Sequence, residues 1–417
     1  METEPSRPHR RMRALAATVL VPSLLAAGCA GGPAAPQDRI LTVYLADDWA
    51  DTAPVADAVR DFEADNPGVE VRVTGVPFSR LPDAVRDAAE RGTPVDVAQW
   101  HAFAAAALDL AQPVTDLFDE TWDREEYLPG AITDVEWEGE LHGVPLDTAA
   151  MVIVANTDLL AEAGTPLVGI DDIDDLGVAA RAVSADRPRG LVLSLSTWAL
   201  YGFVRAFGGD LVEVAEDGTP TFLLDSPEVV ATMEFLGDLV ADGAAVPPQE
   251  SGLGSDATVL FGNGELAFHA TGAWDIASFA RTGVDFDLEV IPVPQSAGGL
   301  GTTLGGSSLF VPTSSEQREL AFAFMAHLTS DEYARRFAAE EGRLPAREAL
   351  FDDPLFDDPS FAPVRDSLEV AEPMLLIAWP EATEALIDAI ADVTIGGVPA
   401  DEAMRIAQRR AETSVAG

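Results

Sequence analysis

The stretch "ILTVYLADDWADTAPVADAVRDFEADNPGVEVRV", residues 40 to 73, decides the fold. Apolar side chains occupy alternate positions from 41 to 45, which predicts a β-strand. They then recur at helical spacing from 55 to 62, and Asn-Pro-Gly at 66 to 68 ends that helix. Alternation resumes from 69 to 73. The stretch therefore predicts a strand, a helix and a second strand.

The same order continues through a helix around residues 81 to 88 and a short strand at 95 to 98. Strands that alternate with amphipathic helices form a mostly parallel sheet covered on both faces, so we expect an α/β fold. Ligands of such sheets bind beyond the carboxyl ends of the strands. The residues that follow the first and third strands are Asp47, Asp48, Trp49, Trp100 and His101.

Farther along, residues 149 to 155 predict a long strand, followed by a helix capped near Asn156 or Thr157. Asp147 and Thr148 interrupt this apolar region with polar side chains, which is unusual in a buried strand.

Two further helices, near 198 to 201 and from 226 to 239, precede the Gly- and Ser-rich run "SAGGLGTTLGGSSLFVP" at 296 to 312. This run separates two structured regions, and we expect the chain to cross between lobes there. Its glycine spacing does not match a dinucleotide-binding loop, and no helix is expected to begin on it.

The N-terminus predicts an export signal. Arginines between positions 7 and 13 precede an apolar segment from 14 to 27, and Cys29 follows it. This order resembles the lipobox of bacterial lipoproteins, whose cysteine is lipidated, although Ala26 stands where Leu is usual. We expect Cys29 to be a lipid anchor; the alternative is a plain secretory signal with an incidental cysteine. The Arg10-Arg11 pair leaves the twin-arginine route open beside general secretion.

The composition excludes several classes of function. There are 71 acidic and 25 basic residues, all of the latter arginine, and the net charge is −46. Nucleic acids and anionic lipids need cationic partners, so neither is expected to bind. Phosphate-binding P-loops, Schiff-base enzymes and Ser-x-x-Lys acyl-enzymes all need lysine. The acid excess suggests a salt-rich habitat, whereas a GC-rich genome explains only the missing lysine.

The single cysteine rules out an internal disulfide, and the roughly 390 residues that follow it predict two lobes with their own cores. No later stretch reaches the ~18 apolar residues that a membrane-spanning helix needs. Four scattered histidines remain after the signal, none at i, i+4 from another, so neither a metal site nor a cofactor is expected.

The stretch "GELAFHATGAWDI", residues 264 to 276, places Trp274 beside Asp275 just after a glycine. A buried core favours tryptophan but not aspartate. An aromatic face next to a carboxylate instead suits a polar, ring-shaped ligand.

Six stretches, in order, resemble the bacterial extracellular solute-binding proteins of family 1, which include maltose-binding protein. They are "FEADNPGVEVRV" (62–73), "RGTPVDVAQW" (91–100), "GELHGVPLDTAAMVIVANTDLLAEAG" (139–164), "FGNGELAFHATGAW" (261–274), "IPVP" (291–294) and "AFAFMAHLTSDE" (321–332). The resemblance implies a two-lobed periplasmic-binding-protein-like fold. Its ligand would lie in a cleft between the lobes and be captured by hinge closure, without covalent chemistry.

The resemblance also implies a domain organisation and partners. Residues 1–28 would be the signal peptide and 29–38 a tether; 39–146 with 307–353 would form lobe I, and 147–306 with 354–417 lobe II. The protein would be a monomer on the outer face of the cell membrane, tethered through lipidated Cys29. It would deliver a sugar to the transmembrane subunits of an ABC permease.

The resemblance assigns roles to individual side chains. Trp274 stands where many sugar-binding members place an aromatic platform, and Trp379 resembles a second such position. Asp147 and Gly306 lie at the expected crossings, Trp198 and Tyr201 fall where another aromatic contact often lies, and Arg343 is a further candidate. Asp47, Asp48, Trp49, Trp100, His101 and Asp275 complete the predicted ligand contacts.

Three functions remain open from the sequence. The first is carbohydrate transport, because tryptophan suits the C–H face of a sugar and carboxylates accept from its hydroxyls. The second is the same fold binding an organic cation such as a polyamine, since tryptophan beside carboxylates also attracts cations. The third is an exported glycoside hydrolase that uses two of the carboxylates. Nothing in the sequence marks a carboxylate pair at a defined separation.

Overall fold

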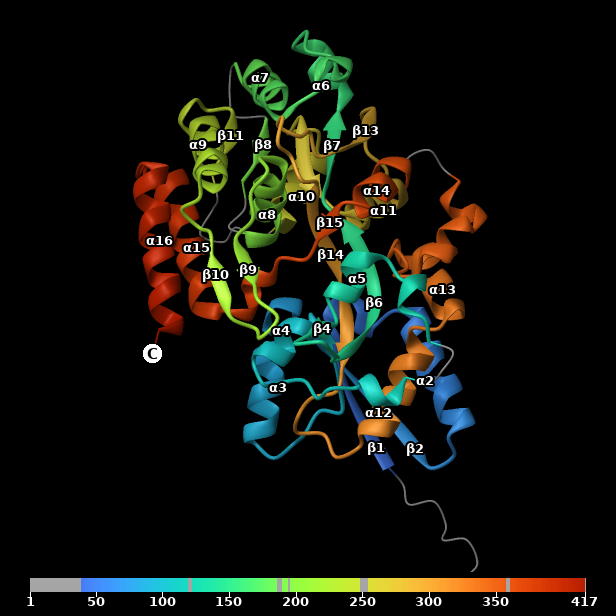
Figure 1. Cartoon of the computed structure of the whole chain (residues 1–417). Helices are drawn as coiled ribbons and strands as arrows, with labels where there is room; N and C mark the ends of the chain where they lie inside the picture. The colour runs from blue at the N-terminus through green and yellow to red at the C-terminus, as the bar shows by residue number, and fades with distance from the viewer. Residues whose placement is uncertain are drawn as a thin grey trace, which may run out of the picture. The chain divides into compact units, whose positions relative to one another are not determined.

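The computed structural model describes residues 39–118, 122–185, 190–193, 196–247, 254–357 and 361–416. The folded unit extends from Asp38 to Gly417 (Figure 1). The predicted signal peptide, Cys29 and the predicted tether lie outside the described residues. No helix in the described ranges is long and apolar enough to span a membrane.

The first lobe is built on a six-stranded sheet. β1 (Arg39–Ala46) pairs in parallel with β2 (Val69–Val76) and β3 (Val97–Trp100), and alternate side chains of β1 are buried. α2 (Ala53–Asp65) and α3 (Leu81–Glu90) connect these strands. The predicted strand-helix alternation is therefore confirmed, with the third strand two residues later than expected.

Two segments link the sheets of the molecule. β6 (Gly143–Ala150) belongs to the six-stranded sheet, and β7 (Val152–Asn156), one residue later, belongs to a three-stranded sheet. β14 (Thr302–Phe310) returns to the first lobe and pairs antiparallel with both β3 and β6. Thus most of the Gly- and Ser-rich run is not a loop but a strand at the centre of the sheet.

Close packing explains the glycine at position 306 of this strand. Gly306 has φ +98°, and a Cβ there would lie 2.4 Å from the carbonyl oxygen of Asp147 on β6. Only glycine fits this approach. The register between β6 and β14 shifts between Ser307 and Ser308, which bends the pair at this point.

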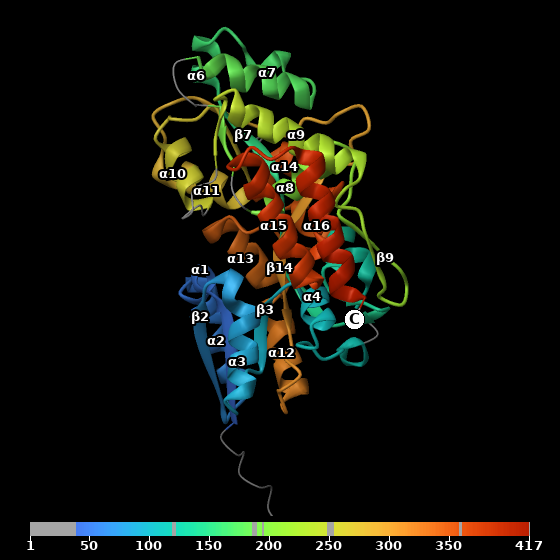
Figure 2. The same cartoon turned by 90° about the vertical axis from the view of Figure 1, so that its left-hand side faces the viewer.

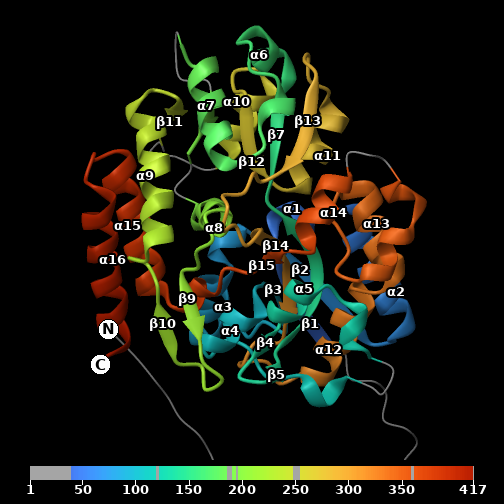
Figure 3. The ribbon, with the colours of Figure 1, turned by 45° about the horizontal axis from the view of Figure 1, so that its top comes forward.

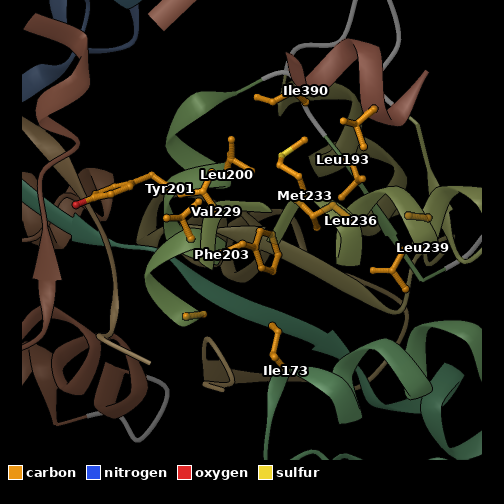
Figure 4. Close-up of a cluster of buried hydrophobic side chains, with 14 of the residues drawn as sticks. Ile173, Leu193, Leu200, Tyr201, Phe203, Val229, Met233, Leu236, Leu239 and Ile390 are labelled. Atoms are coloured by element: carbon orange, nitrogen blue, oxygen red, sulfur yellow. The ribbon is translucent and has the colours of Figure 1, made fainter. Parts of the chain in front are cut away.

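The second lobe surrounds the antiparallel sheet of β12 (Phe268–Thr271), β7 and β13 (Leu288–Pro292). Its helices are α6 (Thr157–Glu162), α7 (Ile173–Val183), α8 (Thr197–Ala206), α9 (Pro227–Ala241), α10 (Gly254–Gly262) and α11 (Ala273–Thr282). The Asn156 side chain accepts a bond from the Leu159 N–H at 3.1 Å, which confirms the predicted cap of α6. Figure 4 shows part of this lobe's core, with Met233 and Leu236 of α9 near Phe203 of α8.

The C-terminal third is shared between the two lobes. α12 (Arg318–Leu328) and α13 (Asp331–Glu341) pack on α2 of the first lobe. α14 (Ala362–Leu368) packs on β13, while α15 (Pro380–Thr394) and α16 (Ala400–Val415) pack beside α9 of the second lobe (Figures 2 and 3). The exact lobe boundaries near residues 146, 306 and 353 remain a prediction.

Shorter elements complete the fold. They are α1 (Asp47–Ala50), α4 (Ala102–Ala107), α5 (Pro129–Thr133), β4 (Glu136–Trp137), β5 (Glu140–Leu141), β8 (Leu191–Val192), β9 (Val212–Val214), β10 (Pro220–Phe222), β11 (Ala245–Val246) and β15 (Ala371–Glu372). β15 extends the first lobe's sheet by pairing with Thr302 and Thr303 of β14.

Candidate functional site

A cleft of about 580 Å³ lies between the two lobes. The ends of β1 and β3 form one side, α8 and α11 form the other, and the crossing strands β6 and β14 form the floor. Of the predicted contact residues, the following line it: Asp48, Trp49, His101, Asp147, Trp198, Trp274, Asp275, Gly306 and Arg343.

Two tryptophans form the wall contributed by the second lobe. The rings of Trp198 on α8 and Trp274 on α11 lie 5.3 Å apart between centroids, inclined at 50°. The Trp198 indole N–H donates to the carbonyl oxygen of Leu304 on β14 at 2.8 Å, so its polar edge is satisfied. A Cβ at Gly272 would lie 2.3 Å from the Trp274 ring. The glycine before α11 therefore lets this ring lie across the backbone.

Asp275 follows this platform and is held by three donors. Its Oδ2 accepts from Thr271 Oγ1 at 2.6 Å and from Thr258 Oγ1 at 2.9 Å, and lies 2.8 Å from His269 Nε2. Burial by itself raises the pKa of this carboxyl, but the hydrogen bonds from His269 and the threonines outweigh it and lower the pKa. Asp275 is therefore a fixed anion at neutral pH.

Asp147 lies on the floor of the cleft at the crossing strand β6. Its Oδ1 accepts from Ser307 Oγ at 2.7 Å, Ser307 Oγ accepts from Gln99 Nε2 at 2.8 Å, and Gln99 Oε1 accepts from the Ala46 N–H at 2.9 Å. Burial raises the pKa of Asp147 to about 6, and the positive charge of Arg343 only partly opposes this rise. At neutral pH the Asp147 carboxyl is therefore mostly ionised, although the residue is only 6% exposed.

Arg343 connects two predicted residues of the first lobe. It forms an ion pair with Asp48, and its guanidinium lies 5.3 Å from the centroid of the Trp49 ring. The other surroundings of Trp49 are apolar, including Phe337 of α13 at 4.6 Å between centroids. Trp49 is 3% exposed, so it supports Arg343 more than it offers a free aromatic face.

His101 is positioned by a buried carboxylate. Its Nδ1 lies 2.6 Å from Asp134 Oδ1, and Ser308 Oγ lies 2.8 Å from the other oxygen of Asp134. Phe78 contacts the His101 ring edge-on at 5.5 Å between centroids. Because Nδ1 faces Asp134, Nε2 is the nitrogen available to the cleft.

The comparisons with known proteins agree with this geometry. The family model described as bacterial extracellular solute-binding protein matches residues 57–363, most of the chain. The chain belongs to this family. Solute-binding proteins are not enzymes, so the prediction of a non-enzymatic protein is confirmed.

Individual relatives of this solute-binding protein are distant. The sn-glycerol-3-phosphate-binding periplasmic protein UgpB of Rhizobium meliloti is 24% identical over 56% of this chain and 56% of its own length. The arabinooligosaccharide-binding protein of Halalkalibacterium halodurans is 25% identical over 53% and 51%. The chain thus spans about half the length of these two curated relatives.

The fold matches over much more of the chain. The GacH receptor of Streptomyces glaucescens, solved unliganded and in complex with acarbose, superposes with a TM-score of 0.77 at 22% identity, covering 91% of this chain and 98% of that one. The predicted two-lobed α/β fold is therefore confirmed.

Four predicted contact residues lie outside the lining of the cleft. Asp47 is exposed at the start of α1. Trp100 packs against α4 in the first lobe. Tyr201 is 2% exposed in the core of the second lobe, where its hydroxyl donates to Asp210 at 3.1 Å (Figure 4). Trp379 lies 5.9 Å from the ring centroid of Trp137, away from the cleft-lining residues.

The structure adds cleft-lining residues that the sequence analysis did not single out. They are Ala46, Phe78, Gln99, Ser196, Arg281, Gly305, Ser307 and Glu341. Gln99 carried a usable signal, because it is a polar side chain at the end of an otherwise apolar strand, as Asp147 is. Arg281 and Glu341 lie near the ends of helices, where charged residues are common and not diagnostic.

Among the described residues, no group of three or more His, Cys, Asp or Glu side chains could hold a metal ion. Hydrogen bonding, charge and aromatic contact are therefore the interactions that the described cleft offers.

Proposed function

We propose that this solute-binding protein captures a carbohydrate outside the cytoplasm and delivers it to an ABC permease. The observation that carries the proposal is the Trp198–Trp274 pair, which faces a cleft whose remaining walls supply carboxylates, an imidazole and guanidinium groups. The acarbose complex of GacH and the arabinooligosaccharide relative support the same ligand class.

The chemistry of a pyranose suits this cleft. Its C–H face packs on indole rings, and its hydroxyl rim donates to carboxylates such as Asp147 and Asp275. The cavity of about 580 Å³ is within the ordinary range for small-molecule sites. A dissociation constant of ~1 µM needs about −8 kcal/mol, which stacked rings and charge-assisted hydrogen bonds can supply after ordering costs.

Capture by hinge closure follows from the placement of the ligand groups. Trp198 and Trp274 belong to the second lobe, while Asp48 and His101 belong to the first. A ligand that touches both sides stabilises the closed arrangement, which the permease would recognise. The bend at Ser307, where β6 and β14 pass between lobes, is the proposed hinge together with the predicted boundaries near 146, 306 and 353.

The tether belongs to the same proposal. Residues 1–28 would act as an export signal, and lipidation of Cys29 would hold the mature monomer at the outer face of the membrane. Replacing Cys29 with Ser should move the protein from the membrane fraction to the soluble fraction without changing ligand affinity.

The chain's other relatives offer a competing ligand class. The name of the Rhizobium meliloti relative suggests a polyol phosphate. Carboxylates outnumber guanidinium groups in this cleft, however, and would repel a phosphate. A polyamine remains the alternative ligand, and the next experiment distinguishes it from a carbohydrate.

The test is a tryptophan-fluorescence titration of residues 30 to 417 with mono- and oligosaccharides, sugar phosphates and polyamines, in low and high salt. Saturable shifts with saccharides, without hydrolysis, are the expected result. Shifts with polyamines alone, or with phosphates alone, would overturn the carbohydrate assignment. A Trp274→Ala variant separates binding in the cleft from nonspecific quenching.

A further inference from the structure

The charges that line the cleft do not balance. Among the described residues, four carboxylates line it, those of Asp48, Asp147, Asp275 and Glu341, and two guanidinium groups, those of Arg281 and Arg343. Arg343 is already paired with Asp48, and Arg281 donates to the carbonyl oxygen of Glu340 at 3.2 Å. No lysine exists in the chain to supply another cation.

Two of these carboxylates are only half satisfied. Asp147 and Asp275 are 6% and 9% exposed, and the hydrogen bonds described above reach one oxygen of each, Oδ1 of Asp147 and Oδ2 of Asp275. Within the part of the chain that the structure describes, the second oxygen of each has no hydrogen-bond partner. Both residues line the cleft.

We propose that the preferred ligand is a saccharide that carries a protonated amino group, bound beside the Trp198–Trp274 pair by the carboxylates of Asp147 and Asp275. The inference rests on the proposed function and narrows its ligand class. An ammonium group has three donors and a full charge, so it can satisfy the free carboxylate oxygens. Indole faces also attract cations, so the same aromatic pair serves both parts of the ligand.

A neutral sugar would not offset the excess negative charge of the cleft. Closure of the lobes removes water from the carboxylates, and a buried charge that is only partly offset, as that of Asp147 is by Arg343, is costly. Hydroxyl groups can fill the free lone pairs but do not offset the charge. A cationic ligand supplies the missing positive charge at the moment of closure.

The test uses three disaccharides with the same β-1,4-linked skeleton: cellobiose, di-N-acetylchitobiose and the fully deacetylated glucosamine disaccharide. They carry hydroxyl, acetamide and ammonium groups at the same carbon. Isothermal titration at pH 6.5, where the amines are largely protonated, measures the three dissociation constants for the exported chain, residues 30 to 417. The expected result is at least tenfold tighter binding of the glucosamine disaccharide than of either neutral partner.

Variants connect that preference to the two carboxylates. Asp147→Asn and Asp275→Asn should each reduce the preference for the ammonium form, measured as the ratio of the dissociation constants of cellobiose and the glucosamine disaccharide, at least fivefold. Because Asp275→Asn also loses its bond with His269, Asp147→Asn is the cleaner of the two. Asp51→Asn, an exposed site at the end of α1, removes the same charge outside the cleft and should change nothing.

The outcomes separate this inference from the proposed function. Equal or tighter binding of the neutral disaccharides would overturn the amino-sugar inference and leave the carbohydrate function standing. A preference that persists in Asp147→Asn and Asp275→Asn would also overturn it, because it would arise from the general negative charge. Binding of the polyamine spermidine without binding of any of the three disaccharides would overturn both.

Discussion

Replacing Asp147 with Asn should make the ligand-free protein more stable, and increasingly so as the pH rises. Burial raises the pKa of Asp147 from 3.8 to about 6. The native state therefore binds this proton more tightly than the unfolded chain does. The favourable contribution of this proton to the free energy of unfolding is complete below pH 3.8 and is lost as the pH rises through about 6.

The magnitude follows from the pKa. One pKa unit corresponds to about 1.4 kcal/mol, so the ionised carboxylate costs about 3 kcal/mol of unfolding free energy at pH 8. At pH 5 the cost is only about 1.5 kcal/mol, because the native carboxyl is then mostly protonated. Asn keeps an oxygen that can accept from Ser307 and carries no charge at either pH.

Urea unfolding followed by tryptophan fluorescence measures this difference at pH 5 and pH 8, both above the sequence pI of about 4.1. Asp51→Asn controls for the loss of one negative charge from a chain with a net charge of −46. A variant that gains no more stability at pH 8 than at pH 5, or that is less stable than the parent, would refute the reasoning. A gain at pH 8 would show that Asp147 is retained at a cost to stability, as expected for a binding group.

Three further results are expected. Trp274→Ala should weaken saccharide binding by on the order of 1 to 4 kcal/mol in isothermal titration with little change in the unfolding midpoint; unchanged affinity would make Trp274 structural. Gly272→Ala places a methyl group 2.3 Å from the Trp274 ring, so the ring must move, and affinity should fall by about 1 to 2 kcal/mol with a shift in emission maximum. Trp379→Ala should lower the unfolding free energy by on the order of 3 kcal/mol, because it removes contacts with Trp137 and Phe222, but change affinity less than about threefold.

Much of the fold could be predicted from local sequence signals. The alternation of β1 and the cap at Asn156 are short-range patterns, and both appear in the structure as expected. The strand β14 could not be recognised in the same way, because its centre is the run Gly305-Gly306-Ser307-Ser308, and glycine is depleted in strands. These residues form a strand because they pair with β3 and β6, which lie far away in the sequence.

The candidate site was less predictable, for a related reason. Residues that directly follow strands, such as Asp48 and His101, could be placed at the cleft because strand ends share one edge of a sheet. The sequence around a tryptophan gives no comparable indication of where its ring lies. Trp274 lines the cleft and Trp379 packs on Trp137, yet both follow short apolar segments. Gln99 and Ser307 take part through a hydrogen bond between strands more than 200 positions apart, which only the folded chain reveals.

The place of β14 in the sheet also sets the order in which the molecule can be completed. This strand, at residues 302–310, enters between β3 and β6, whose pairing edges stay open until it arrives. About three-quarters of the polypeptide must therefore emerge from the ribosome before the first lobe can close its sheet, and pairing over such separations is slow. The native hydrogen bonds of this sheet therefore cannot all form until residues 302–310 are available to pair.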